Sequence, residues 1–183
     1  MPCCYIVCFV VNLPQSVYKV VKNYILDKAG IDLRLQRMAL EIAEQNMDEQ
    51  RIVIASILPN GAIMSDIIKK ELAKYFDGVI EELTIDLDKR HPGEISLSNQ
   101  PDLNGAVLLL LDDVANSGKT LTYALKPFLE HHPNKIQTAV LVARTHRKFP
   151  IQPDIVGFSL ATTLQDYIDV EVADGVMTGA WIA

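Results

Sequence analysis

Strand-like and helix-like segments alternate along this chain of 183 residues. The strand-like segments are short apolar runs rich in β-branched and leucine residues, as in strands buried on both faces; they cover residues 51–58, 78–87, 106–112, 136–143, 154–160 and 167–172. Between them, apolar side chains recur every three or four residues, as on one face of a helix, over residues 32–45, 62–76 and 119–130. This order predicts an α/β fold with a Rossmann-like parallel sheet and helices on both faces.

Three polar segments each follow one of these strands directly, at residues 58–61, 112–120 and 143–150. In a doubly wound parallel sheet, ligands bind beyond the carboxyl ends of the strands. We therefore expect the three segments to meet at one site, although they lie far apart in the sequence. Residues 88–105 are also polar, with two prolines and two glycines, and such a segment is typical of a functional lid or a short hairpin.

The segment LLLLDDVANSGKT, residues 108–120, combines two features that suit one ligand. Its apolar strand ends on Asp112 and Asp113, whose side chains should point to opposite sides of the strand. After a short turn, Ser117, Thr120 and the backbone N–H groups of a helix start offer an anion site. A ligand with vicinal hydroxyls at one end and a phosphate at the other fits both features, and ribose 5-phosphate is such a ligand.

Two other interpretations of this segment account for less of it. A nucleotide-binding P-loop needs a glycine where Asp113 stands, and a carboxylate there would repel a phosphate chain. A plain strand-to-helix turn, capped by Asn116 or Ser117, explains one polar residue. It leaves two carboxylates at the end of a buried strand unexplained, so we favour the ribose phosphate site.

Composition limits the partners and the compartment. The net charge of −6 and the pI of about 5.2 argue against charge-driven binding of nucleic acid, so RNA is not an expected partner. The three cysteines, Cys3, Cys4 and Cys8, cluster near the N-terminus with no histidine nearby, which predicts neither a disulfide framework nor a zinc site and fits a reducing compartment. The apolar opening MPCCYIVCFVV is too short to span a bilayer and suits a buried strand or an extension. We therefore expect a cytoplasmic protein without a membrane segment.

Residues 112–120 resemble the phosphoribosyl pyrophosphate signature of the type I phosphoribosyltransferases: two acidic residues after an apolar strand, a small turn, then Ser-Gly-x-Thr. Residues 135–160 resemble the pyrimidine-operon attenuator proteins, which are also uracil phosphoribosyltransferases. The matching residues are Gln137, Arg144, His146, Arg147, Pro150, Ile151, Asp154, Val156 and Gly157. The stretch PDIVGF is also similar to hypoxanthine phosphoribosyltransferases. The resemblance covers the chain from Asn23 to about Val172.

The resemblance implies a single type I phosphoribosyltransferase domain over residues 1–183, with a core at about 30–160 and an atypical N-terminal extension at 1–22. Terminal segments would add a small hood to the parallel sheet. The implied reaction transfers ribose 5-phosphate from phosphoribosyl pyrophosphate to a nucleobase in nucleotide salvage, with Mg²⁺ as cofactor. The resemblance also implies a homo-oligomer, a dimer.

The same resemblance implies roles for individual residues. Asp112 and Asp113 would contact the ribose hydroxyls, directly or through Mg²⁺, and would act as catalytic residues together with Asn116. The remaining assignments are a 5-phosphate loop of Asn116, Ser117, Gly118, Lys119 and Thr120, a pyrophosphate loop of Leu58, Pro59, Asn60 and Gly61, a flexible loop with Lys89 and Arg90, and a base site of Arg144, Ile155 and Val156.

The chain departs from the family pattern in the pyrophosphate loop, at Asn116, at Ala143, where the comparison families have an acidic residue or lysine, and at Thr162, where the hypoxanthine enzymes have an aspartate. The attenuator proteins have Lys-Thr-Arg-Gly where this chain has Leu58–Gly61, which lacks a basic side chain and in which Pro59 has no backbone N–H. Asn116 stands where the hypoxanthine enzymes carry a carboxylate, and an amide cannot accept a proton at neutral pH. For Lys89 and Arg90 the alternative is a solvated pair of charges. Two functions therefore remain: an active phosphoribosyltransferase, or a catalytically impaired regulatory protein that binds nucleotide or phosphoribosyl pyrophosphate.

Overall fold

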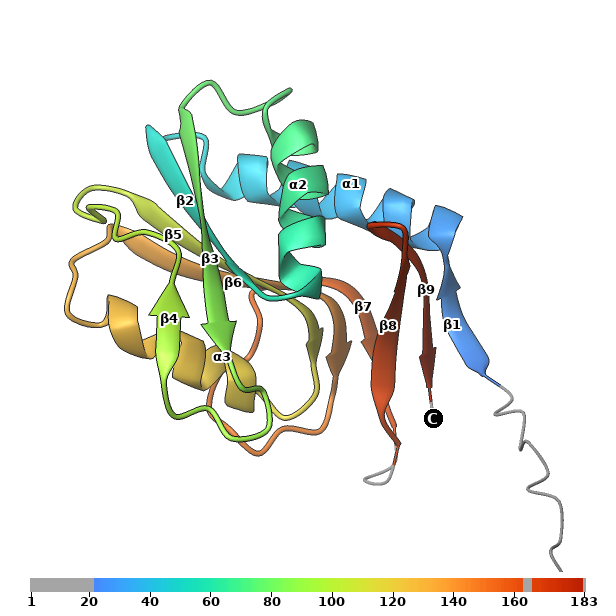
Figure 1. The fold of residues 1–183 in the computed structure, drawn as a ribbon. Helices are drawn as coiled ribbons and strands as arrows, with labels where there is room; N and C mark the ends of the chain where they lie inside the picture. The colour runs from blue at the N-terminus through green and yellow to red at the C-terminus, as the bar shows by residue number, and fades with distance from the viewer. Residues whose placement is uncertain (1–21, 163–165, 183) are drawn as a thin grey trace, which may run out of the picture.

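The computed structural model describes residues 22–162 and 166–182. The strand expected at the start of the chain lies outside the described residues, as does the expected extension at residues 1–22 apart from Lys22. The described residues form two sheets, a larger one that is mostly parallel and a smaller one that is antiparallel (Figure 1).

Within the described residues, the larger sheet has six strands in the order β4–β3–β2–β5–β6–β7. The parallel strands are β2 (Arg51–Ile57), β3 (Val79–Leu87), β5 (Val107–Ala115), β6 (Lys135–Arg144) and β7 (Ile155–Leu160). β4 (Ile95–Leu97) pairs antiparallel with β3, so the polar segment at residues 88–105 contains a short hairpin. The strand predictions for this sheet are confirmed, and the main difference in length is that β5 runs on to Ala115.

Helices cover both faces of this sheet, as the alternating pattern predicts. α1 (Lys28–Gln45) and α2 (Asn60–Leu72) lie on one face, and α3 (Lys119–Ala124) and the 3₁₀ turn η1 (Lys126–Phe128) lie on the other (Figure 1). Leu109 and Leu111 of β5 pack in the core with α1 and α2, whereas Leu108 and Leu110 pack in the core with α3 and η1. β5 is uninterrupted leucine at its centre because both of its faces are buried.

The smaller sheet forms the hood. β1 (Asn23–Asp27), β9 (Val176–Ile182) and β8 (Ile168–Ala173) pair antiparallel in this order, so the two ends of the described chain lie side by side (Figure 1). The expected hood is confirmed, but the sequence pattern indicated only β8. β9 contains Gly179, which is a poor strand former. A Cβ at Gly179 would lie 2.7 Å from the ring of Tyr24, so this glycine makes room for β1.

The helices differ from their predicted boundaries for local reasons. α1 begins at Lys28 because Asp27 caps it, with Oδ1 accepting a hydrogen bond of 2.8 Å from the backbone N of Gly30. The predicted helix at residues 119–130 breaks after Ala124, just before Pro127, which has no N–H to donate. No helix in the described part of the chain is long and apolar enough to cross a membrane.

Candidate functional site

The acidic pair lies inside β5, and not after it as the sequence suggests. Asp112 pairs in register with Val140 of β6, and the ladder continues to Ala115. Because successive side chains of a strand point to opposite faces, Asp113 faces the first residue of α2, as its hydrogen bond to Asn60 shows. Asp112 is 1% exposed and Asp113 is 6% exposed, a degree of burial that carboxylates tolerate only with partners.

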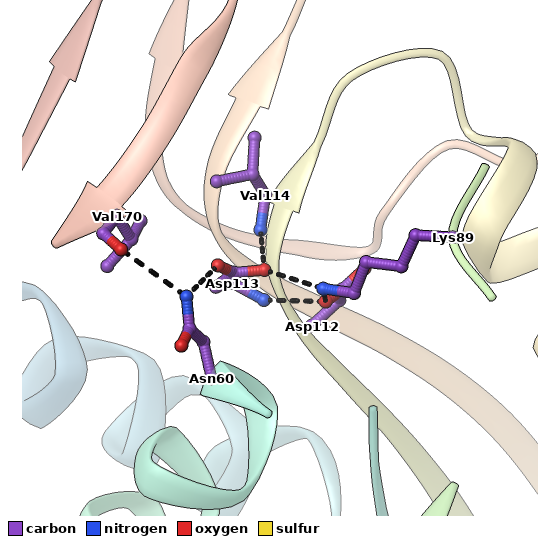
Figure 2. Close-up of polar contacts among 6 residues, drawn as sticks. All are labelled: Asn60, Lys89, Asp112, Asp113, Val114 and Val170. Carbon is purple, nitrogen blue, oxygen red and sulfur yellow. Dashed lines mark hydrogen bonds and ion pairs between the residues drawn. The ribbon is translucent and has the colours of Figure 1, made fainter. Parts of the chain in front are cut away.

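Lys89, from the loop after β3, supplies the compensating positive charge. Its Nζ lies 2.8 Å from Asp112 Oδ1 and 3.1 Å from Asp113 Oδ1, so one ammonium bridges both carboxyl groups (Figure 2). The interpretation of Lys89 as a solvated surface charge is therefore wrong. The structure instead brings a residue of the predicted flexible loop directly onto the acidic pair.

The three groups shift one another's pKa. Burial, helped by the charge of Asp113, raises the pKa of Asp112 to about 8. Burial also acts to raise the pKa of Asp113, but Lys89 and hydrogen bonds from Asp112 and Asn60 outweigh it, so this pKa is lowered. Burial acts to lower the pKa of Lys89, yet the two carboxyl groups raise it to about 12. The two carboxyl groups are therefore not equivalent: the pKa of Asp112 is raised and that of Asp113 is lowered, so Asp112 is the one that takes up a proton first.

Asn60 ties the predicted pyrophosphate loop to the acidic pair. Its Nδ2 donates to Asp113 Oδ2 at 2.7 Å and to the backbone O of Val170 at 3.3 Å (Figure 2). One side chain therefore joins α2, β5 and the hood. A Cβ at Gly61 would lie 3.0 Å from the backbone O of Leu111, so the start of α2 packs closely against β5 and this glycine permits the approach.

The predicted phosphate loop follows β5 and turns at Gly118, whose φ of 79° lies in the left-handed region. The backbone O of Ser117 accepts hydrogen bonds from the backbone N–H groups of Lys148 and Phe149, at 3.1 and 3.0 Å. These bonds join the loop to the segment that follows β6. The shape of the turn is therefore set by backbone contacts as well as by the glycine.

The polar side chains of this loop differ in their contacts. Ser117 Oγ accepts a hydrogen bond of 3.3 Å from the backbone N of Lys119, the first residue of α3, so Ser117 supports the start of the helix. Asn116 Oδ1 is buried and has no hydrogen-bond partner within the described residues, and a buried oxygen of this kind is a place for a ligand's donor. Lys119 Nζ donates to the backbone O of Arg90 at 2.7 Å, which links the phosphate loop to the flexible loop.

A pocket of about 390 Å³ joins these parts. Its walls are Pro59, Asn60, Lys89, Arg90, residues 112–121 and residues 167–169. The fold thus brings together the acidic pair, the phosphate loop, part of the pyrophosphate loop and the flexible loop. Of the three segments expected to meet at one site, residues 58–61 and 112–120 contribute to the pocket, whereas residues 143–150 contact the phosphate loop and are not among the described residues that line it. Tyr167, Ile168 and Asp169 were not predicted as site residues, because their sequence indicates only a short strand and their place depends on how the hood folds back.

The predicted base-site residues are not among the described residues that line this pocket. Ile155 is fully buried in the core that α1 covers. The backbone O of Val156 accepts a hydrogen bond from Arg37 of α1. Arg144 Nε donates to Thr162 Oγ1 at 2.6 Å. In this arrangement Ile155 packs in the core that α1 covers, whereas the Val156 side chain packs against the core on the α3 face of the sheet.

The acidic pair, as arranged, does not fit a metal ion. Lys89 takes one oxygen of each carboxyl group and Asn60 takes Asp113 Oδ2, which leaves Asp112 Oδ2 without a partner in the described chain. Among the described residues, no three His, Cys, Asp or Glu side chains converge to hold a metal. Mg²⁺ needs near-octahedral oxygen ligands, and this cluster offers one buried oxygen.

Comparison with known proteins assigns the chain to a family. Residues 23–173 match the family described as phosphoribosyl transferase domain. The chain belongs to the phosphoribosyltransferase family. One curated relative, the bifunctional protein PyrR of Brevibacillus brevis, is 34% identical over 163 residues, which cover 84% of this chain and 91% of the relative. PyrR of Fusobacterium nucleatum is 31% identical over 157 residues, with 80% and 88% covered.

Solved hypoxanthine phosphoribosyltransferases share the fold. The Trypanosoma cruzi protein gives a TM-score of 0.72 at 14% identity, over 87% of this chain and 95% of that chain. A hypoxanthine-guanine phosphoribosyltransferase of Bacillus anthracis gives 0.69 at 18% identity, over 88% and 97%. These likenesses confirm the predicted type I phosphoribosyltransferase fold. The prediction that RNA is not a partner gains no support from these comparisons, because the sequence relatives are named bifunctional proteins.

Proposed function

We propose that this chain transfers ribose 5-phosphate from phosphoribosyl pyrophosphate to a nucleobase. The observation that carries the proposal is a single pocket lined by both the acidic pair and the Gly118 loop. Asp112, Asp113 and the loop belong to one continuous strand–loop–helix unit, so the backbone sets the distance between them. A ligand with vicinal hydroxyls at one end and a phosphate at the other can contact both within this pocket.

In this proposal the chain acts mainly by positioning its substrates. Backbone N–H groups and hydroxyls of residues 117–120 hold the 5-phosphate, and Asp112 and Asp113 hold the ribose hydroxyls. The bond from C1 to the diphosphate oxygen breaks as the base nitrogen bonds to C1, and the diphosphate leaves with the bonding electrons. Because Asn116 is not a base at neutral pH, the proton of the base nitrogen leaves to water.

The nucleobase side of the pocket is the least specified part of the proposal. Tyr167 lines the pocket and is 57% exposed, so its ring offers a face on which a base can stack. Arg144, Ile155 and Val156 lie outside this pocket, and only the family resemblance supports them as base contacts.

Few groups of the pocket are placed to bind the diphosphate. Asn60 and Arg90 line the pocket near the predicted pyrophosphate loop, whereas Pro59 has no N–H to offer. Mg²⁺ enters the proposal as the companion of the diphosphate, whose charge it balances when bound. The acidic pair itself does not hold the ion, because Lys89 and Asn60 occupy its oxygens. This weak diphosphate set supports a second candidate, a regulatory protein that binds nucleotide without transfer.

The test is a panel of uracil, hypoxanthine, guanine, xanthine and orotate, each with phosphoribosyl pyrophosphate and Mg²⁺. Diphosphate release and nucleotide formation are both measured, with Asp113→Asn as the isosteric control. Turnover with at least one base, reduced about 100-fold or more in the control, supports the transferase. Nucleoside monophosphate binding in a calorimeter without turnover supports the regulatory protein. The absence of both turnover and binding refutes the two candidates together.

A further inference from the structure

The ammonium of Lys89 occupies the place at the acidic pair where a metal cation would bind. It lies 2.8 Å from an oxygen of Asp112 and 3.1 Å from an oxygen of Asp113, and Figure 2 shows its contacts to both side chains. A divalent metal ion would need the same carboxyl oxygens. An ammonium and a metal ion cannot share them, because two cations repel strongly at such short distances.

The oxygens that Lys89 leaves do not make a metal site. Asp113 Oδ2 already accepts a hydrogen bond of 2.7 Å from Asn60. Asp112 Oδ2 has no partner within the described residues, but its residue is only 1% exposed. Metal ions of this kind take about six oxygen ligands, and the described part of the chain holds no converging group of three metal-binding side chains.

The loop that carries Lys89 is anchored at this position. It leaves β3 at Leu87, which is buried in the core. On the other side of Lys89, the backbone N of Arg90 donates to Asp88 Oδ1 at 2.8 Å, and the backbone O of Arg90 accepts from Lys119 Nζ at 2.7 Å. These hydrogen bonds thus fix the loop backbone in the position from which the Lys89 ammonium reaches the acidic pair.

We infer that Lys89 is the resident cation of the acidic pair and keeps divalent metal ions off it. The inference rests on the proposed function only in treating the acidic pair as the site that binds the ribose hydroxyls. It departs from the Mg²⁺ contact that the family resemblance implies for these two residues. Ribose hydroxyls then meet an ammonium and two carboxyl groups, and no metal ion stands between them and the chain.

The test is Mn²⁺ binding by the ligand-free full chain, followed through the electron paramagnetic resonance signal of free Mn²⁺. Lys89→Gln should bind one Mn²⁺ at least about tenfold more tightly than the wild type, because it leaves the carboxyl groups uncompensated. Arg90→Gln removes one positive charge from the same pocket and keeps the backbone bonds that anchor the loop, and it should change Mn²⁺ affinity by less than about threefold. Adding Asp113→Asn to Lys89→Gln should abolish the new site.

Three results would overturn the inference. One is a wild-type protein that binds Mn²⁺ at a site lost in Asp113→Asn, an outcome that requires no Lys89 variant to fold. Another is a Lys89→Gln variant with a native circular dichroism spectrum and no gain in affinity. Lys89→Arg keeps the positive charge and must exclude Mn²⁺ as the wild type does; a new site in this variant also counts against the inference. Since no arm measures catalysis, a failure of the proposed transfer reaction would be seen separately.

Discussion

Replacing Gly118 with alanine tests whether the phosphate loop depends on its backbone shape. Gly118 has a φ of 79°, and a Cβ there would lie 3.0 Å from the backbone O of Ile151 and 3.5 Å from Cβ of Phe149. A left-handed backbone costs an L-residue about 1–2 kcal/mol, and crowding of this kind costs about 1–2 kcal/mol more. We expect Gly118→Ala to lower the free energy of unfolding by about 2–4 kcal/mol in total.

Gly105 and Gly175 separate the two contributions. Both have positive φ, 68° and 74°, but a Cβ at either position meets nothing within 4 Å. Gly105→Ala and Gly175→Ala should therefore lose only the backbone part, about 1–2 kcal/mol. The further loss in Gly118→Ala measures the contact with residues 149–151.

Urea unfolding gives the three free energies, and calorimetry gives the affinity for a nucleoside monophosphate. Because the backbone of the loop holds the phosphate in the proposed function, Gly118→Ala should weaken this affinity about tenfold or more. Gly105→Ala and Gly175→Ala lie outside the pocket and should bind as the wild type does. Equal stability losses in all three variants would contradict the crowding argument, and wild-type affinity in Gly118→Ala would show that this turn does not hold the ligand.

Three further substitutions test the site and its support. Asn60→Ala removes a 2.7 Å hydrogen bond to the Asp113 carboxylate, so urea unfolding should show a loss of about 1.5–3 kcal/mol, and an unchanged stability would contradict the bond. Asn46 is buried and bonded at 2.7 Å to Gln137, away from the pocket; Asn46→Ala should cost about 1–3 kcal/mol without changing nucleotide affinity measured by calorimetry. Leu109 is fully buried in β5, so Leu109→Ala should cost about 2–5 kcal/mol, seen as a lower melting temperature.

The fold was largely predictable because its main signals are local. The all-leucine run of β5 indicates a strand with two buried faces, and the apolar spacing of α1 indicates one buried helix face. The hood was harder to predict, because β9 contains Gly179, a poor strand former. This glycine is explained only by the ring of Tyr24, which packs against it in the folded chain. The end of β5 was misplaced for a related reason: polar aspartates mark the end of an apolar run, but pairing with β6 continues past them.

The chemistry of the site divides in the same way. The sequence alone determined that an apolar run, an acidic pair and a glycine turn succeed one another, since their order and spacing are written in consecutive residues. Only the tertiary structure decided what the acidic pair contacts. Asn60 and Lys89 come from segments far apart in the chain and each contacts the pair, and Val170 of the hood contacts Asn60 in turn. Such contacts leave no local pattern, because they follow from how α2, the loop after β3 and the hood fold over β5.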